Sequence, residues 1–188
     1  MPCFTSSELL TLNWITQALT FDPLTQTFYF SDWEWMQASS MIRSVNKLGT
    51  TISLVVDVFR GNITGLTIDA KRGLLFFADA GNNKICSVHT DGLNLQTLYA
   101  DLPDLRSIAV DTNTFEIYWT TWGSQPGIYK GHYQGNTLIS TVVAGGLKQP
   151  DGLAMDSLGN PYQAQIVKNL ILTLTFIERQ FCPIVYLN

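Results

Sequence analysis

Four aspartates recur at nearly even intervals and are the residues best placed to do chemistry. Asp69 follows Asp22 by 47 residues, Asp111 follows Asp69 by 42, and Asp156 follows Asp111 by 45. Carboxylates gathered at one point could hold a calcium ion, because hard cations prefer clustered oxygen ligands. A metal-binding or catalytic residue is usually placed once, however, whereas these four occupy the same place in a recurring phrase. We therefore expect them to be structural, each accepting backbone N–H groups at a strand end.

The residues of nucleophilic catalysis form no recognisable constellation. The sequence has no Gly-x-Ser-x-Gly elbow, and only His89 and His132 could serve as a base. Both fall near expected hairpin turns, where a solvated imidazole is the ordinary case and a pH-sensing imidazole is the alternative. Cys3, Cys86 and Cys182 are odd in number and widely spaced, which favours neither a disulfide framework nor a zinc site. No catalytic residue, metal or cofactor is predicted.

Composition limits the classes of partner. The 188 residues are 46% apolar, 12% aromatic and 14% charged, with a net charge of −4, so disorder and a coiled coil are excluded. The 11 Lys and Arg residues are scattered and form no basic stripe for nucleic acid. The most apolar run, residues 170–177, is far shorter than the ~20 residues of a membrane span. The first residues lack a secretory signal, so either the protein is cytosolic or its true start is missing.

An internal repeat must position the four aspartates. Each aspartate ends one copy of a short phrase, and the copies are Ala18–Asp22, Gly65–Asp69, Ser107–Asp111 and Gly152–Asp156. A period in the forties fits either a four-stranded propeller blade or a pair of helices. After each of the first three phrases come a turn, an aromatic β-rich run and two further short runs. This pattern predicts an all-β propeller of four-stranded antiparallel blades.

The repeat also predicts the domain boundaries. Three complete blades are expected, followed by the start of a fourth: residues 18–64, 65–106, 107–151, and from 152 onward. Residues 1–17 are expected as the outer strand or lead-in of a preceding blade. After residue 160 the aromatic second strand is missing, so residues 161–188 are expected to be a divergent tail. Three blades cannot close a ring, and an open arc would expose apolar surface on its end blades.

The aromatic runs resemble the YWTD, or low-density-lipoprotein-receptor class B, repeat. Tyr118-Trp-Thr-Thr121 departs from Tyr-Trp-Thr-Asp in its last residue, whereas Tyr29-Phe-Ser-Asp32 and Phe76-Phe-Ala-Asp79 keep the aspartate and vary before it. The three runs stand in register with the period, and the resemblance covers about residues 9–160. It implies a propeller that has six blades when complete, in which Asp32 and Asp79 are structural.

The resemblance also implies a ligand face near the propeller axis. In family members that bind proteins, contacts come from the residue after the YWTD motif and from the residue before the Gly-Leu-Ala phrase. These positions are Trp33, Ala80 and Trp122, and Thr64, Arg106 and Asp151, respectively. Because Trp and Arg dominate interface hot spots, the candidate ligand residues are Trp33, Trp122, Arg106 and Asp151. The alternative is that both tryptophans are packed between blades.

The function implied by the resemblance is protein binding without catalysis. The chain would be a fragment of a lipoprotein-receptor-like extracellular or cell-surface propeller, active in ligand binding and release, endocytosis or signalling. Its partners would be a lipoprotein or secreted factor, with epidermal-growth-factor-like modules flanking it in the full-length protein. In that setting the sequon Asn62-Ile-Thr64 predicts glycosylation at Asn62. The alternatives are a calcium-dependent hydrolase or lactonase on a six-bladed propeller, and a nidogen-like matrix adhesion protein.

Overall fold

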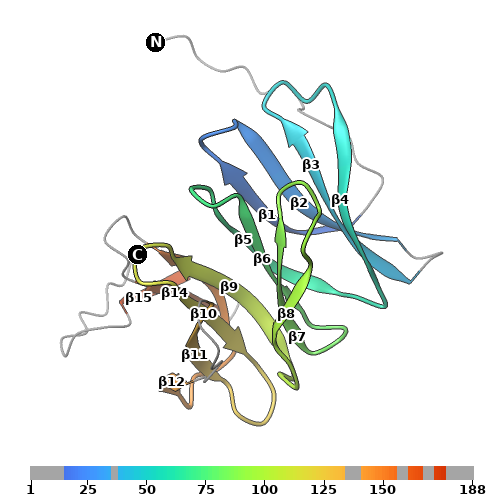
Figure 1. The fold of residues 1–188 in the computed structure, drawn as a ribbon. Helices are drawn as coiled ribbons and strands as arrows, with labels where there is room; N and C mark the ends of the chain where they lie inside the picture. Colours follow the sequence, from blue (N-terminus) through green and yellow to red (C-terminus); the bar gives the residue numbers. More distant parts are fainter. Residues whose placement is uncertain (1–14, 35–37, 134–140, 156–160, 167–171, 177–188) are drawn as a thin grey trace.

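A computed structural model of the protein describes residues 15–34, 38–133, 141–155, 161–166 and 172–176. All regular elements in these residues are β-strands, arranged in four antiparallel sheets that we call blades 1 to 4 (Figure 1). Blade 1 consists of β1 (Ile15–Asp22), β2 (Thr27–Glu34), β3 (Ser39–Asn46) and β4 (Ile52–Phe59). Blade 2 consists of β5 (Ile63–Asp69), β6 (Leu74–Asp79), β7 (Lys84–His89) and β8 (Gln96–Tyr99). Blade 3 consists of β9 (Leu105–Asp111), β10 (Glu116–Thr121), β11 (Gly127–His132) and β12 (Thr141–Gly145). Blade 4 consists of β13 (Pro150–Met155), β14 (Pro161–Ile166) and β15 (Leu172–Phe176).

The blades follow one another around a common axis. Within each blade the strands pair in chain order, and the first strand of each blade contacts the first strand of the next, β1 with β5, β5 with β9, and β9 with β13. Figure 1 shows the blades succeeding one another with these first strands on the inner side. This is the arrangement of a β-propeller, so the predicted all-β fold is confirmed.

Aromatic second strands fill the spaces between blades. In β6, Phe76 and Phe77 are both fully buried but belong to different cores, because successive side chains of a strand point to opposite faces. Phe77 packs toward blade 1, in the cluster that includes Tyr29 and Ile42. Phe76 packs toward blade 3, in the cluster that includes Trp119. Paired aromatic residues therefore serve two interfaces at once, which accounts for the aromatic content of the chain.

Side-chain hydroxyls join the innermost strands of neighbouring blades. Ser31 accepts a hydrogen bond from the Ala18 backbone N–H (3.0 Å) and donates to the Ile63 carbonyl (3.2 Å). Two blades further along, Thr120 donates to the Asp151 carbonyl (3.0 Å). Both hydroxyls occupy the third position of their aromatic runs. The small polar residue of that motif thus holds the first strand of the next blade near the axis.

The observed blades begin slightly before the predicted ones. β1 begins at Ile15, β5 at Ile63 and β9 at Leu105, whereas the repeat phrases begin at residues 18, 65 and 107. Each of these strands contains a register shift in its pairing with the second strand. The pairing continues on the N-terminal side of the shift, so the strand begins before the repeat phrase does. The expected lead-in up to residue 14 and the tail beyond residue 176 lie outside the described residues.

Part of the predicted divergent tail belongs to blade 4. β14 pairs with β13, and β15 pairs with β14, with Tyr162 opposite Phe176 and Ala164 opposite Leu174. Both segments alternate apolar and polar residues, as in Leu172-Thr-Leu-Thr-Phe176, which is a strand pattern. The prediction missed them because it relied on the aromatic motif, which this blade lacks.

Candidate functional site

The repeat aspartates close the turns that follow the first strands. In blade 1 the Asp22 carboxylate accepts the Leu24 N–H (2.8 Å) and the Thr25 hydroxyl (2.7 Å). In blade 3 the Asp111 carboxylate accepts the equivalent groups of Asn113 (2.8 Å) and Thr114 (2.9 Å). Both carboxylates are buried and are engaged within their own turns. Asp156 lies outside the described residues.

Asp69 also links two blades. Its carboxylate pairs with Arg72 (2.6 Å) and accepts the Tyr133 hydroxyl of blade 3 (3.1 Å). Burial, together with the neighbouring carboxylate, raises the pKa of Tyr133, so the phenol keeps the proton that it donates. The Arg72 guanidinium lies over the Phe115 ring at 4.2 Å, which adds a second contact between blades 2 and 3. Across the residues that the structure describes, no three His, Cys, Asp or Glu side chains lie close enough together to hold one metal ion.

The aspartates of the aromatic motif are bound at the opposite end of the blades. Asp79 accepts hydrogen bonds from the Asn62 N–H (2.9 Å), the Asn82 N–H (3.2 Å) and the Asn82 side-chain amide (2.7 Å). Asp32 instead pairs with Arg43 at 2.6 Å. At the same position of blade 3, the Thr121 hydroxyl donates to the Gln125 carbonyl (3.1 Å). This end of the propeller is therefore a set of ordered loops around buried polar groups.

Three of the candidate ligand positions meet at one cavity. A hollow of about 350 Å³ lies between the first strands of the four blades, and Thr64, Arg106 and Asp151 line it. The Thr64 hydroxyl is committed to the Leu105 carbonyl (3.2 Å). The side chains of Arg106 and Asp151 are half-buried. The cavity therefore lies at the axis, with a cation and a carboxyl group among its lining side chains.

Arg106 and Trp122 form a stacked pair beside this cavity. The Arg106 guanidinium lies 3.6 Å from the centroid of the Trp122 ring, a cation–π distance. The indole N–H of Trp122 donates to the Pro150 carbonyl (2.8 Å), which fixes the ring against blade 4. The Arg106 Nε is buried without a hydrogen-bond partner, and among the described residues no carboxylate lies within 4.0 Å of the guanidinium. The cation is held in place by an aromatic ring and has no ionic partner in the described structure.

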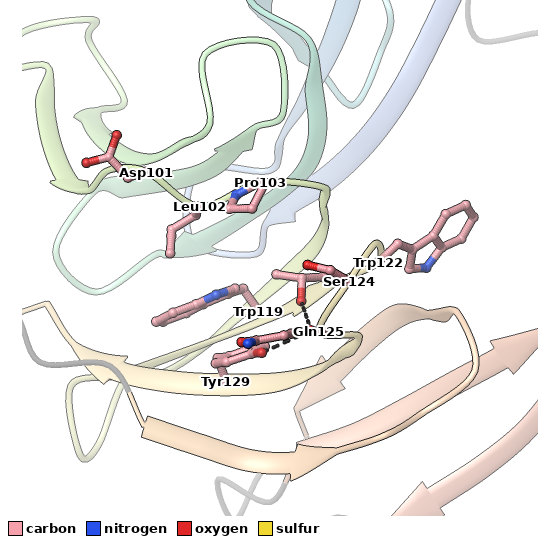
Figure 2. Close-up of a pocket in the computed structure, with 9 residues that line it drawn as sticks. Asp101, Leu102, Pro103, Trp119, Trp122, Ser124, Gln125 and Tyr129 are labelled. Atoms are coloured by element: carbon pink, nitrogen blue, oxygen red, sulfur yellow. Dashed lines mark hydrogen bonds between the residues drawn. The ribbon is translucent and has the colours of Figure 1, made fainter.

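Trp122 also borders a pocket between blades 2 and 3. Figure 2 shows Trp119 and Tyr129 on one side of this pocket, Leu102 and Pro103 on another, and the Trp122 ring directed away from it. The Trp119 and Tyr129 rings are stacked, with centroids 6.1 Å apart. The Tyr129 hydroxyl donates to the Gln125 carbonyl (3.0 Å). The pocket has a volume of about 200 Å³. No sequence signal marks this pocket, because an aromatic residue at position 119 of a strand predicts only a core position.

Two of the other positions carried over from the family lie elsewhere. Trp33 is half-buried and lines a separate cavity of about 340 Å³ together with Arg60 and Asn62. Gln17 lines both this cavity and the axial one. Ala80 packs against the core between blades 2 and 3. Trp33 and Trp122 therefore line different cavities, and an anchor patch that contains both tryptophans stays a prediction.

The predicted glycosylation site lies at the link between blades 1 and 2. The Asn62 backbone N–H donates a hydrogen bond to the Asp79 carboxylate, and the Asn62 carbonyl accepts one from the Ala80 N–H (2.8 Å). Its side chain is half-buried, and glycosylation there stays a prediction. His89 is half-buried beside the β7–β8 turn, and His132 is exposed at the end of β11. A pH-sensing role for either histidine likewise stays a prediction.

Cys86 should behave as an inert core thiol. It is buried in β7, and burial raises the pKa of its thiol, partly offset by the Thr97 hydroxyl at 3.8 Å. Because the thiolate is the reactive form, we expect a disulfide dye to label Cys86 at least about tenfold more slowly in the native protein than in urea. A variant with Cys3→Ser and Cys182→Ser would isolate this signal. Equal rates in the two conditions would contradict the burial of Cys86.

The comparisons with known proteins agree with this architecture. No protein-family model matches the chain. A chain from a crystal structure of a nidogen/laminin complex is similar over 80% of this chain, with a TM-score of 0.70 and 22% identity. TolB from Acinetobacter baumannii is similar over 94% of this chain, with a TM-score of 0.73 and 10% identity. The chain is a β-propeller. It spans 57% and 44% of the length of those two chains, and at these identities the likeness shows the fold alone.

In the part of the propeller that the structure describes, no helix is long and apolar enough to cross a membrane.

Proposed function

We propose that this propeller binds protein partners without catalysis, and that its ligand face is formed by Arg106, Trp122 and the axial cavity. The observation that carries the proposal is the Arg106 guanidinium, stacked on Trp122 and lacking a carboxylate partner among the described residues. Ordering the cation in advance lowers the entropy cost of binding. An acidic side chain of a partner would complete the site with charge-assisted hydrogen bonds.

The cellular setting that we propose follows the YWTD resemblance. The chain would belong to an extracellular or cell-surface protein of the lipoprotein-receptor type, glycosylated at Asn62 and flanked by epidermal-growth-factor-like modules. Its roles would lie in ligand capture and release, endocytosis or signalling. Support comes from the motif in three blades and from the structural likeness to a chain of a nidogen/laminin complex, a protein–protein assembly by its description. A nidogen-like role in matrix adhesion is therefore the second candidate.

Surface plasmon resonance can test the ligand face. The 188-residue chain would be passed over immobilised low-density lipoprotein and immobilised laminin, one probe for each candidate role. We expect Arg106→Ala to weaken binding at least about tenfold, because truncation of a hot-spot residue costs more than about 1.4 kcal/mol. Trp122→Ala should act in the same direction, because it removes the ring that orders the guanidinium.

A matched control is available at the other end of β5. Lys71 is an exposed cation in the turn after Asp69, far along the strand from Thr64, and Lys71→Ala should leave the affinity unchanged. Equal affinities of Arg106→Ala and the unmodified chain would contradict the ligand face. If the chain bound neither low-density lipoprotein nor laminin, both candidate roles would be contradicted. Calcium-dependent turnover of a lactone or ester would replace the proposal with the hydrolase alternative.

A further inference from the structure

Arg106 lines the axial cavity from an irregular part of β9. Between the pair Leu105 and Thr121 and the pair Ile108 and Trp119, β9 has two residues where β10 has one. This irregularity is a β-bulge, which redirects the side chains of the strand that contains it. Arg106 is the first residue of the bulge, so the direction of its side chain depends on how the bulge is held.

Two hydrogen bonds fix the backbone directly before Arg106. The Asp104 carbonyl accepts the backbone N–H of Trp122 at 2.9 Å. The Leu105 carbonyl accepts the hydroxyl of Thr64 at 3.2 Å, and this donor comes from the neighbouring blade 2. The Leu105 side chain is only 1% exposed, so the bulge begins at a buried anchor. Thr64 therefore connects blade 2 to the start of the bulge.

Equivalent hydrogen bonds occur at the two other interfaces between the described blades. Between blades 1 and 2, the Ser31 hydroxyl donates to the Ile63 carbonyl (3.2 Å). Between blades 3 and 4, the Trp122 indole N–H donates to the Pro150 carbonyl (2.8 Å). At Ile63, Leu105 and Pro150 alike, the carbonyl belongs to the residue directly before a position that lines the axial cavity. A side chain of one blade thus fixes the backbone that leads to the axial position of the next.

We propose that Thr64 is a positioning residue for the Arg106 guanidinium. The proposal rests on the proposed function, because it gives Thr64 a part in the same ligand face. The Thr64 hydroxyl has one proton to donate, and the Leu105 carbonyl receives it. Because β-branching restricts χ1, this hydroxyl is directed at the carbonyl with little loss of side-chain entropy. Thr64 thereby holds the bulge, and the bulge holds the guanidinium 3.6 Å from the centroid of the Trp122 ring.

Nuclear magnetic resonance of the isotope-labelled chain tests the positioning role without a partner. Because the guanidinium lies over an aromatic ring, the ring current displaces the Arg106 Nε–H signal to higher field, and Arg106→Lys identifies the signal by removing it. We expect Thr64→Val to abolish most of this displacement, because it keeps the shape of the side chain but removes the hydroxyl. Thr64→Ser keeps the hydroxyl and should retain the displacement. The chain would be produced without N-glycosylation, because Thr64 also belongs to the sequon at Asn62.

Surface plasmon resonance on low-density lipoprotein and laminin gives the second readout. Without the Thr64 hydroxyl the guanidinium has to be ordered when the partner binds. We therefore expect Thr64→Val to weaken binding about threefold to tenfold, the cost of immobilising one long side chain. Thr64→Ser should restore the affinity.

Thr67→Val is the matched control. Thr67 is also a half-buried threonine of β5, but its hydroxyl makes no hydrogen bond in the described part of the chain. This variant should change neither the Arg106 signal nor the affinity. Circular dichroism melting verifies the fold of each variant, and Thr64→Ala, whose side chain is smaller, replaces Thr64→Val if the latter does not fold.

The outcomes separate the positioning role from the proposed function. If Thr64→Val displaced the Arg106 signal and the unmodified chain bound neither probe, the positioning role would stand and the proposed function would fall. An unchanged Arg106 signal in Thr64→Val would overturn the positioning role. Weaker binding with that signal unchanged would overturn it too, because Thr64 would then contact the partner directly. Equal effects of Thr64→Val and Thr67→Val would show that the contact with Leu105 has no special part, and would likewise overturn it.

Discussion

Trp119→Ala is expected to lower the free energy of unfolding by about 3–5 kcal/mol, the usual cost of truncating a fully buried tryptophan. Trp119 is fully buried between blades 2 and 3. Its ring lies 5.0 Å from that of Tyr99 in blade 2 and stacks on Tyr129 within its own blade. Removing the indole leaves a cavity at an interface that both blades need, so neither sheet can fill it alone.

The measurement is urea unfolding followed by circular dichroism, with Trp122→Ala as the control. Trp122 is the same residue type only three positions away, but it is half-buried and contacts Arg106 at the axial end. We expect it to cost less than about half as much, since less apolar surface is lost from the core. If the two variants were equally stable, Trp119 would not be the centre of the interface.

Asp79→Ala is expected to cost about 2–3 kcal/mol, because it removes a buried carboxylate and leaves three partly buried donors without their acceptor. The carboxylate receives three hydrogen bonds, one from Asn62 and two from Asn82. The first joins the blade 1–2 link to the end of β6, so its loss loosens the connection between blades. The cost is thus larger than the net value of one hydrogen bond.

Asp91→Ala provides the comparison for this variant. The Asp91 carboxylate accepts one backbone hydrogen bond, from Leu93 at 2.9 Å, but does so in an exposed turn where water can replace it. Its loss should cost less than about 1 kcal/mol. Asp79→Asn keeps an acceptor oxygen and should lie between the two. Equal losses for Asp79→Ala and Asp91→Ala in urea unfolding would show that burial of the Asp79 carboxylate contributes nothing.

Local strand structure could be predicted because each blade is encoded by neighbouring residues. The repeat phrase ending in Asp22, Asp69 or Asp111 gives the first strand, and the aromatic run that follows gives the second. The strands of blade 4 were missed for the converse reason. Residues 161–166 and 172–176 carry the alternation of a strand but none of the motif aromatics. An alternation search independent of the motif would have found them.

The candidate site was predicted less completely than the fold. Thr64, Arg106 and Asp151 were placed on one face by the family resemblance, and the structure brings them to one axial cavity. Trp33 was grouped with Trp122, but it lines a different cavity. The pocket beside Trp119 left no sequence signal, because a buried aromatic in a strand looks the same whether or not a pocket borders it.

The sequence by itself determined the repeat and the strands of the first three blades. These depend on turns and on the period of two, which are properties of residues close together in the chain. Only the tertiary structure decided that Arg106 stacks on Trp122 and that Thr64 and Asp151 line the same axial cavity. Those outcomes depend on how one blade packs against the next, and such packing joins residues from different repeats.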